Sequence, residues 1–130
     1  MKITRILIVD DSTDNLDLTR LLLETEGYEV WTAEDAPQAM SVLESHRPDL
    51  ILMDVQLPGM DGLELTRRLR RERAWDGVPI VALTAYAMRG DEEKARSAGC
   101  DGYVTKPIDT RTFGQRVREY LRERRAMQGG

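Results

Sequence analysis

Three short apolar runs constrain the fold of this chain more than any other feature. They are ILIV at residues 6–9, LILM at residues 50–53 and IVAL at residues 80–83. A strand with one face in water alternates apolar and polar residues, whereas a strand covered on both faces is apolar throughout. These runs therefore predict strands inside a parallel sheet, with helices on both sides of it.

Amphipathic segments separate these runs, so that strand-like and helix-like patterns alternate five times along the chain. The 130 residues are enough for one domain with its own core, and no internal repeat or low-complexity linker divides them. We therefore predict an α/β fold of the (βα)5 type, with a doubly wound five-stranded parallel sheet. The predicted strands are Arg5–Val9, Glu29–Ala33, Leu50–Met53, Ile80–Leu83 and Gly102–Val104.

Capping residues and the helical spacing of apolar residues predict five helices. Asp35 is the expected N-cap of the second helix, and Gly27 and Gly99 are expected to end the first and the fourth. Five arginines between Arg67 and Arg73 are expected to form a solvated face. The predicted helices are Thr13–Glu26, a segment that starts after Asp35 and ends before Pro48, Leu63–Arg71, Asp91–Ala98 and Thr110–Arg125, with a flexible tail at residues 126–130.

Charge and hydropathy limit the classes of partner. The formal net charge of -4 argues against a general polyanion binder, so we expect no direct contact with nucleic acid. No stretch approaches the ~20 apolar residues that span a bilayer, and the first apolar run is too short for a signal peptide. We expect a cytoplasmic protein with no membrane contact of its own.

The cysteine and histidine content points the same way. The single cysteine, Cys100, cannot form an intramolecular disulfide, and no Cys/His cluster has the spacing of a zinc site. A lone histidine, His46, is more often a surface residue than a ligand. We therefore interpret Cys100 and His46 as structural residues.

Five polar residues stand where predicted strands end. In an open parallel α/β sheet the ligand site lies at the carboxyl ends of the strands, so these residues should meet in one crevice. They are Asp10 and Asp11 after the first strand, Asp54 after the third, Thr84 after the fourth and Lys106 after the fifth.

The residue types in this set indicate phosphoryl chemistry. Three crowded carboxylates repel one another, and a divalent cation with oxygen ligands is the ordinary way to keep all of them ionised at neutral pH. We therefore expect a Mg2+ site. A lysine and a hydroxyl aimed at the same point suit an anionic phosphoryl group carried on an aspartate, which predicts that Asp54 accepts phosphate.

Each of these residues also has an ordinary structural interpretation. Asp10 and Asp11 could cap the first helix, and Asp54 could open a Pro-Gly turn. Thr84 could simply end a strand, and Lys106 could lie in a surface turn. Chance readily explains the placement of any one of these residues at a strand end, but it poorly explains all five together. We therefore favour a shared functional site.

Four sequence stretches carry a resemblance to a known family. They are ILIVDDS, PDLILMDVQLPGMDGLEL, PIVALTA and GYVTKPI, and their order and spacing resemble the receiver domain of bacterial two-component response regulators. Within that family, ALTAYAMRGDEEKARSAGCDGYVTKPI is most similar to the single-domain DivK-like group and to receivers of hybrid histidine kinases. The resemblance implies a flavodoxin-like strand order, 2-1-3-4-5, and a receiver domain over residues 1–125.

The resemblance also implies a role for each matched residue. Asp54 would be the phosphoacceptor, and the cofactor would be Mg2+, for which Mn2+ can substitute. The Lys106–Pro107 peptide bond would be cis. The implied metal ligands are Asp10, Asp11, Asp54 and the main-chain carbonyl of Gln56, while Lys106 would pair with a phosphoryl oxygen, Thr84 would be the switch hydroxyl and Tyr103 the switch aromatic.

Partners follow from the same resemblance. The donor would be a phosphohistidine on a sensor histidine kinase or a histidine phosphotransfer protein. The output would be a phosphorylation-dependent contact with an effector protein, made by a monomer or a weak dimer, and the chain would not be a turnover enzyme. Four arginines of the fifth helix, between residues 116 and 124, could complement an acidic partner. The expected contact surface lies on the fourth helix, fifth strand and fifth helix, around Tyr86, Ala87, Met88, Tyr103 and Ile108.

Several alternatives remain open at this point. The chain could be a receiver fragment of a hybrid kinase or a phosphate sink, although its two ends suggest a protein that stands alone. A haloacid dehalogenase-type phosphatase needs a second aspartate two positions after the nucleophile, where this chain has Gln56. A flavodoxin-like flavin carrier needs a phosphate loop rich in Ser, Thr and Gly rather than DDSTDN. A DNA-binding transcription factor would need an effector domain.

Overall fold

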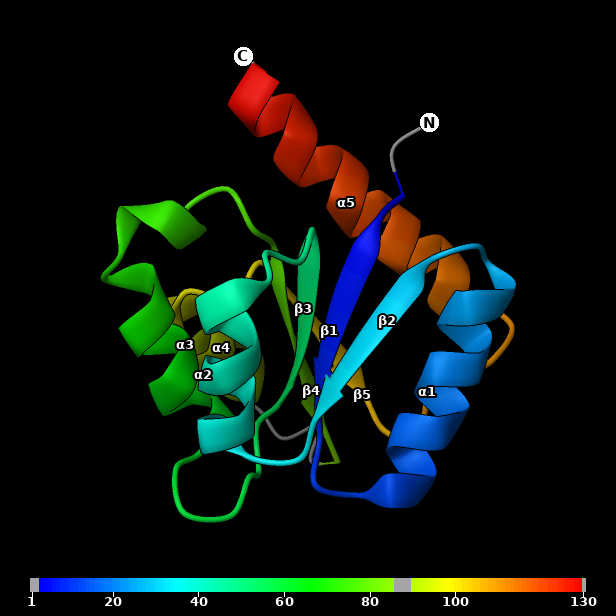
Figure 1. Cartoon of the computed structure of the whole chain (residues 1–130), viewed down its shortest axis with the longest axis horizontal. Helices are drawn as coiled ribbons and strands as arrows, with labels where there is room; N and C mark the ends of the chain where they lie inside the picture. The colour runs from blue at the N-terminus through cyan, green and yellow to red at the C-terminus, as the bar shows by residue number, and fades with distance from the viewer. Residues whose placement is uncertain (1–2, 86–89, 130) are drawn as a thin grey trace.

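The computed structural model describes residues 3–85 and 90–129, with side chains as far as residue 123. It is a three-layer α/β fold in which helices cover both faces of one parallel sheet (Figure 1). The strand order is β2-β1-β3-β4-β5, which confirms the predicted topology. The strands are β1 (Arg5–Val9), β2 (Glu29–Ala33), β3 (Leu50–Asp54), β4 (Ile80–Thr84) and β5 (Gly102–Thr105).

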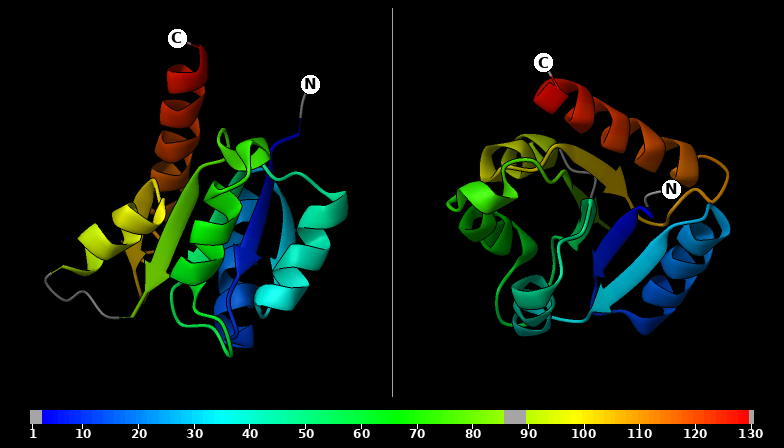
Figure 2. Two further views of the ribbon diagram at one scale, coloured as in Figure 1. Left: turned by 90° about the vertical axis from the view of Figure 1, so that its left-hand side faces the viewer. Right: turned by 45° about the horizontal axis from the view of Figure 1, so that its top comes forward.

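The sheet separates two apolar clusters, which is why its central strands are apolar throughout. Leu7 and Val9 of β1 pack with residues of α2, α3 and α4, whereas Ile6 and Ile8 pack with residues of α1 and α5. Figure 2 shows these helices on the two sides of the sheet. The helices are α1 (Thr13–Thr25), α2 (Ala36–Ser45), α3 (Gly62–Arg70), α4 (Asp91–Ala98) and α5 (Phe113–Gly129), with a short 3-10 helix, η1 (Arg73–Trp75).

Local signals set most of the helix ends. The Asp35 side chain accepts a main-chain N–H three residues further on, as an N-cap does, which confirms the predicted start of α2. Gly27 and Gly99 have φ angles of 94° and 111° after α1 and α4, a left-handed conformation that favours glycine. Asp61 caps α3 in the same way as Asp35 caps α2, and α3 therefore begins one residue earlier than predicted.

The ends of α5 differ from the prediction. The helix begins at Phe113 rather than Thr110, because the Asp109 carbonyl accepts the N–H groups of Thr112 and Phe113 in a preceding turn. It continues to Gly129, so the predicted helix end at Arg125 is wrong. Residues 126–128 are Ala, Met and Gln, which favour helix, and the sequence has no stop signal before the final glycines. The division of the chain at residue 125 into domain and flexible tail remains a prediction.

The expectation that all five arginines near the end of α3 are solvated is wrong for Arg70. Its guanidinium donates to the carbonyls of Gly99 (2.9 Å) and Trp75 (2.6 Å) and to the Asp101 carboxylate (2.7 Å). Asp101 also accepts the N–H of Ile80, at 2.9 Å. These bonds tie α3, η1 and the turn before β5 together at the end of the sheet opposite the predicted site.

Two further residues behave as structural side chains. Cys100 is buried, and burial raises the pKa of its thiol to about 11. The exposed His46 ring lies edge-on against Trp31, with ring centroids 4.7 Å apart.

Among the described residues there is no helix with the length and apolar content that a bilayer crossing needs.

Candidate functional site

The carboxyl ends of β1, β3, β4 and β5 bring the predicted site residues together. Asp54 is the last residue of β3, and Asp10 and Lys106 follow β1 and β5 directly. The Lys106 ammonium lies 2.9 Å from a carboxylate oxygen of Asp54 and 2.9 Å from one of Asp10. Residues that are 96 positions apart in the sequence, 10 and 106, thus contact each other through side chains.

Three carboxylates form an acidic cluster beside this lysine. Asp10, Asp11 and Asp54 each offer an oxygen, and these oxygens all lie within 4.8 Å of one another. Asp10 and Asp54 are buried, with exposed fractions of 1% and 4%, whereas Asp11 is exposed. Two buried acids thus lie at the floor of the cluster and one exposed acid lies at its rim.

The buried acids are only partly satisfied by the protein. Asp10 Oδ1 accepts the N–H of Ser12 at 2.9 Å. Asp10 Oδ2 lies near Lys106, but it is buried and has no partner in hydrogen-bond geometry among the described residues. The one ammonium of Lys106 must therefore serve Asp10 and Asp54 together, which leaves two buried carboxylates with a single positive charge. A divalent cation held by Asp10, Asp11 and Asp54 would meet this need, so the donor set fits Mg2+.

Asp54 combines burial with two donors. Its Oδ1 accepts the N–H of Gln56 at 2.9 Å, and its Oδ2 accepts from Lys106 at 2.9 Å. Burial raises the pKa of Asp54 to about 6, against the lowering effects of Lys106 and the Gln56 N–H, and the Asp10 charge raises it further. The carboxyl group is therefore mainly ionised at neutral pH.

The start of α3 packs directly against this acid. A Cβ on Gly62 would lie 2.0 Å from the Asp54 carbonyl oxygen, so only glycine fits there. The Gly62 N–H also donates to the Val55 carbonyl, at 2.9 Å. The loop from β3 to α3 therefore leaves the sheet and returns to it within a few residues of the phosphoacceptor candidate.

Lys106 is held by its own main chain as well. Its N–H donates to the Thr84 carbonyl at 2.7 Å, and its peptide bond to Pro107 is cis, as the resemblance implied. Burial alone would lower the pKa of Lys106, but the Asp54 and Asp10 carboxylates raise it above its ordinary value. The lysine is therefore fully charged where it faces the acids.

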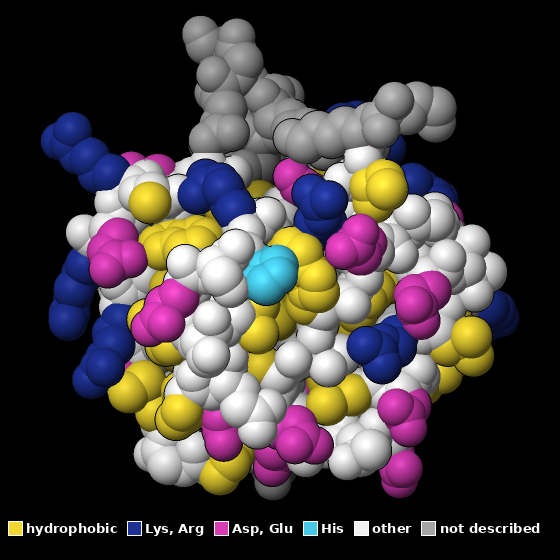
Figure 3. Space-filling view, viewed as in Figure 1, with side chains coloured by type: hydrophobic (Ala, Val, Ile, Leu, Met, Phe, Trp, Pro, Cys, Tyr) yellow, Lys and Arg dark blue, Asp and Glu magenta, His cyan; other side chains and the backbone are white. Residues whose placement is uncertain are grey.

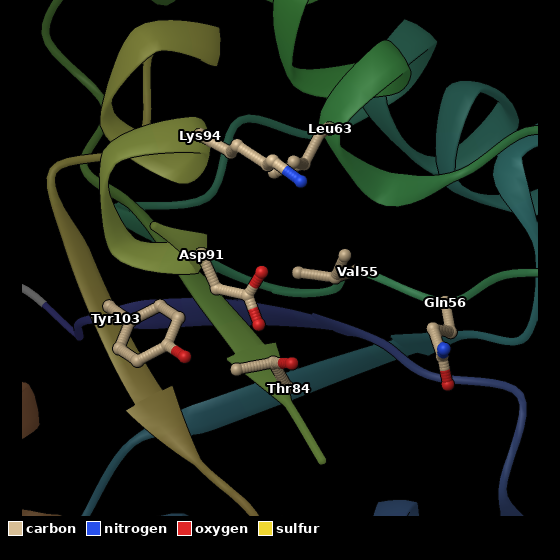
Figure 4. Close-up of a pocket in the computed structure, with 7 residues that line it drawn as sticks. All are labelled: Val55, Gln56, Leu63, Thr84, Asp91, Lys94 and Tyr103. Atoms are coloured by element: carbon tan, nitrogen blue, oxygen red, sulfur yellow. The ribbon is translucent and has the colours of Figure 1, made fainter. Parts of the chain in front are cut away.

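A hollow of about 280 Å³ adjoins the acidic cluster on the α4 side. Thr84 and Gln56 line it, and the Tyr103 ring and the Asp91 carboxyl group point toward Thr84 (Figure 4). Burial and then the charges of Asp91 and Glu92 raise the pKa of the Tyr103 hydroxyl. Thr84 and Tyr103 thus share one partly open space.

Sequence reasoning missed two residues of this hollow. Asp91 and Lys94 of α4 line it, although neither was predicted as a site residue. Their spacing of three positions on the helix that follows Thr84 was the available signal, because it places both side chains on one helix face.

The main chain of Tyr103 is bound by α5, which was also not predicted. Arg116 donates to the Tyr103 carbonyl at 2.9 Å, and the Tyr103 N–H donates to the Tyr120 hydroxyl at 3.4 Å. Arg116 is therefore not only an exposed cation of the expected contact surface.

Three residues predicted for that surface, at positions 86, 87 and 88 (Tyr86, Ala87 and Met88), lie outside the described residues.

A comparison with protein-family models decides the family. The response regulator receiver domain matches residues 6–118, which is most of the chain. The chain belongs to this family. It is accordingly a receiver domain of two-component signalling, as its sequence motifs predicted.

Individual relatives agree with this assignment. The chain is 42% identical to the polar-differentiation response regulator DivK of Brucella anthropi over 116 residues, 89% of this chain and 94% of that protein. It also resembles the CheY-like receiver domain protein of Methanospirillum hungatei, with 36% identity, a TM-score of 0.87 and coverage of 97% and 99%. The receiver domain of a Pseudomonas aeruginosa sensor histidine kinase, solved with magnesium coordinated in its active site cleft, has 35% identity, a TM-score of 0.83 and coverage of 92% and 98%.

Proposed function

We propose that Asp54 accepts a phosphoryl group from a phosphohistidine on a sensor histidine kinase or a histidine phosphotransfer protein. The observation that carries this proposal is the position of Lys106, 2.9 Å from Asp54, beside three clustered carboxylates. A buried carboxylate with a fixed ammonium at its side is suited to receive an anionic group. The exchange with such a donor would take place in the cytoplasm.

The transfer step can be written from these residues. The Asp54 carboxylate oxygen attacks phosphorus, an O–P bond forms, and the N–P bond of the donor breaks with its electron pair passing to the imidazole nitrogen. Lys106 pairs with a phosphoryl oxygen as charge develops, and the Thr84 hydroxyl donates to another. Thr84 is suited to this because it ends the strand next to Asp54 and faces the same crevice.

Asp10, Asp11, Asp54 and the main-chain carbonyl of Gln56 would hold Mg2+, or Mn2+ in its place. The buried Asp10 oxygen, which has an ion pair with Lys106 but no partner in hydrogen-bond geometry among the described residues, supports this set, and so does the similar receiver that was solved with magnesium in its cleft. When bound, the cation supplies charge neutralisation at the phosphoryl oxygens. Gln56 is part of the proposal because its N–H already orients the Asp54 carboxylate.

The first turns of α1 suit the approach of a donor. Leu18 and Leu21 are large apolar side chains with exposed fractions of 39% and 63%, on the helix that begins two residues after Asp11. Exposed apolar side chains beside a reactive centre favour contact with another protein. We include this face of α1 in the proposed donor contact.

Phosphorylation would be read out through Thr84 and Tyr103. A phosphoryl group on Asp54 would draw the Thr84 hydroxyl toward it, and Tyr103 would follow into the adjoining hollow. The surface of α4, β5 and α5 would then change and bind an effector protein. Partial exposure of Tyr103 and Ile108 supports this surface.

Beryllofluoride, a stable mimic of the phosphoryl group, tests this part of the proposal. With Mg2+ present it should shift the amide resonances of Thr84, Tyr103 and the α4 residues, and Asp54→Asn should abolish the shifts. Asp17→Asn, a change at an exposed acid of α1, is the matched control and should behave like the wild type. Shifts confined to the β3–α3 loop would contradict the proposed readout.

A further inference from the structure

One edge of the sheet is open. The Glu29 N–H donates to the Thr4 carbonyl, and the Ala33 carbonyl accepts from the residue that follows β1. Odd-numbered residues of β2 therefore face β1, and the main-chain groups of Val30 and Thr32 point away from the sheet. Within residues 3–85 and 90–129, no hydrogen bond closes this outer side at Val30 or Thr32.

The opposite edge, at β5, is covered by side chains at Tyr103. Arg116 and Tyr120 of α5 bind the main-chain carbonyl and N–H of Tyr103, at 2.9 Å and 3.4 Å. The Tyr120 ring packs on Gly102 so closely that a Cβ there would lie 2.2 Å from it. Unpaired strand edges attract other chains, and proteins commonly cover them. The contrast makes the open β2 edge a candidate binding surface.

A groove runs along this open edge. It has a volume of about 350 Å³ and lies between Arg20 of α1 on one side and, on the other, Val42 of α2 and His46, which follows that helix. In Figure 1, β2 passes between α1 and α2 at the front of the molecule. Figure 3 shows the same face, with the histidine in cyan next to hydrophobic side chains. Val30 and Thr32, whose main-chain groups point outward, line this groove together with Trp31.

The two walls of the groove differ in chemistry. On the α2 side, Trp31 is fixed between the His46 ring at 4.7 Å and the Arg5 guanidinium at 5.9 Å, and Val42 lies beside it. On the α1 side, Arg20 has a loose contact with Glu24, at 3.9 Å, with both side chains about half exposed. The α2 wall therefore offers two apolar contacts, Trp31 and Val42, between the hydroxyl groups of Ser41 and Ser45, and the other wall carries a cation that can pair with an acid.

We propose that the free edge of β2 binds an extended segment of a partner protein as a sixth strand. Because side chains alternate along a strand, the segment would present apolar residues to Trp31 and Val42 and acidic residues to Arg20. Main-chain bonds to Val30 and Thr32 would supply affinity, and the two walls would supply selectivity. This surface is separate from the α4–β5–α5 surface and does not depend on phosphorylation of Asp54.

The helices beside the groove favour a single segment over a second copy of the chain. In a β2-to-β2 dimer, the α1 and α2 helices of both copies would crowd around one strand pair. A lone extended segment brings no helices of its own. The Arg20 charge on one side and the Trp31 and Val42 side chains on the other therefore favour a peptide that alternates apolar and acidic residues.

A capped pentapeptide of alternating valine and glutamate is the probe. Titrated into the full chain, it should shift the amide resonances of Val30 and Thr32 and slow their hydrogen exchange at least tenfold at saturation. The matched control is the same peptide with N-methyl groups on the amides that would face β2, which removes its donors. Absence of slowed exchange, or equal effects of the methylated peptide, would overturn the proposal.

Charge reversal on the groove wall tests the predicted selectivity. Arg20→Glu should weaken binding of the valine–glutamate peptide about tenfold and favour a valine–lysine peptide, whereas Arg122→Glu, at an exposed arginine of α5, should change neither. Equal losses of peptide affinity in both variants would show unspecific charge attraction. They would overturn the proposal that Arg20 contacts the acidic residues of the segment. Concentration-dependent dimers whose Val30 and Thr32 amides are protected without peptide would instead assign the edge to a second copy. Unchanged beryllofluoride binding in Arg20→Glu verifies that the variant is folded.

Discussion

Lys106 Nζ lies 2.9 Å from Asp54 Oδ2, although 52 positions separate the two residues in the chain. The parallel order of β3, β4 and β5 creates this contact, because all three strands end at the same edge of the sheet. The same ammonium lies 2.9 Å from Asp10. A single cation thus compensates two buried acids.

Replacing this cation should destabilise the chain when no metal is present. We expect Lys106→Met to lower the free energy of unfolding by about 2 kcal/mol at neutral pH, since Asp10 and Asp54 would then face each other uncompensated. Urea unfolding measures this. Lys94→Met is the control, because Lys94 lines the neighbouring hollow without an ion pair to these acids, and it should stay within about 0.5 kcal/mol of wild type. Equal losses would contradict the pairing.

The acidic cluster should make stability depend on Mg2+. A ligand that binds only the native state raises the melting temperature, so Mg2+ should stabilise the wild type. Asp11→Asn should melt higher than the wild type without metal, because it relieves repulsion in the cluster, and should lose most of the Mg2+ effect. Asp14→Asn, at an exposed acid of α1, should keep the full Mg2+ effect. A less stable Asp11→Asn that still responds to Mg2+ would be evidence against this metal site.

The raised pKa of Asp54 gives a pH dependence with a definite sign. Its folded pKa of about 6 exceeds the ordinary value of 3.8, so the native state binds the proton more tightly than the unfolded state. In metal-free buffer, the stability that protonation of Asp54 adds to the native state is therefore fully present below the ordinary pKa of 3.8. It is lost as the pH rises through about 6.

Asp54→Asn removes this titration. Measured by urea unfolding, the difference in stability between Asp54→Asn and wild type should shift in favour of the variant by about 3 kcal/mol as the pH rises from below 3.8 to above 6. A difference that does not vary with pH would mean that Asp54 is not destabilised by burial.

The tight approach of α3 to β3 should make Gly62 sensitive to a single methyl group. Gly62→Ala would place a Cβ 2.0 Å from the Asp54 carbonyl oxygen, so we expect a loss of about 3 kcal/mol and weaker beryllofluoride binding. Gly27→Ala meets no atom within 4 Å but has a φ of 94°, and it should cost only about 1 kcal/mol without affecting binding. Thermal melts and titrations of both variants distinguish the two cases.

Much of the fold and of the acidic cluster could be predicted from the sequence, because both follow from strand ends. Uninterrupted apolar runs mark covered strands, and the residue after such a run must lie at the sheet edge. This reasoning predicts that Asp10, Asp54, Thr84 and Lys106 lie close together, and the structure has Lys106 in contact with Asp10 and Asp54, although the chemical roles of these residues remain predictions.

Contacts made by helix side chains could not be predicted in this way. Asp91 and Lys94 reach the hollow, and Arg116 reaches the Tyr103 carbonyl, only because of how α4 and α5 pack on the sheet. In sequence they look like ordinary surface charges. Arg70 was mistaken for the same reason, since its partners come from three different segments.

Intact-mass spectrometry after incubation with acetyl phosphate and Mg2+ tests the central claim most directly. We predict that the wild type and Asp17→Asn gain one phosphoryl group, that Asp54→Asn gains none, and that chelation of the metal prevents the gain in all three. Lys106→Met should be labelled more slowly. Equal labelling of Asp54→Asn would contradict the account, because the phosphoryl group would then reside on another residue.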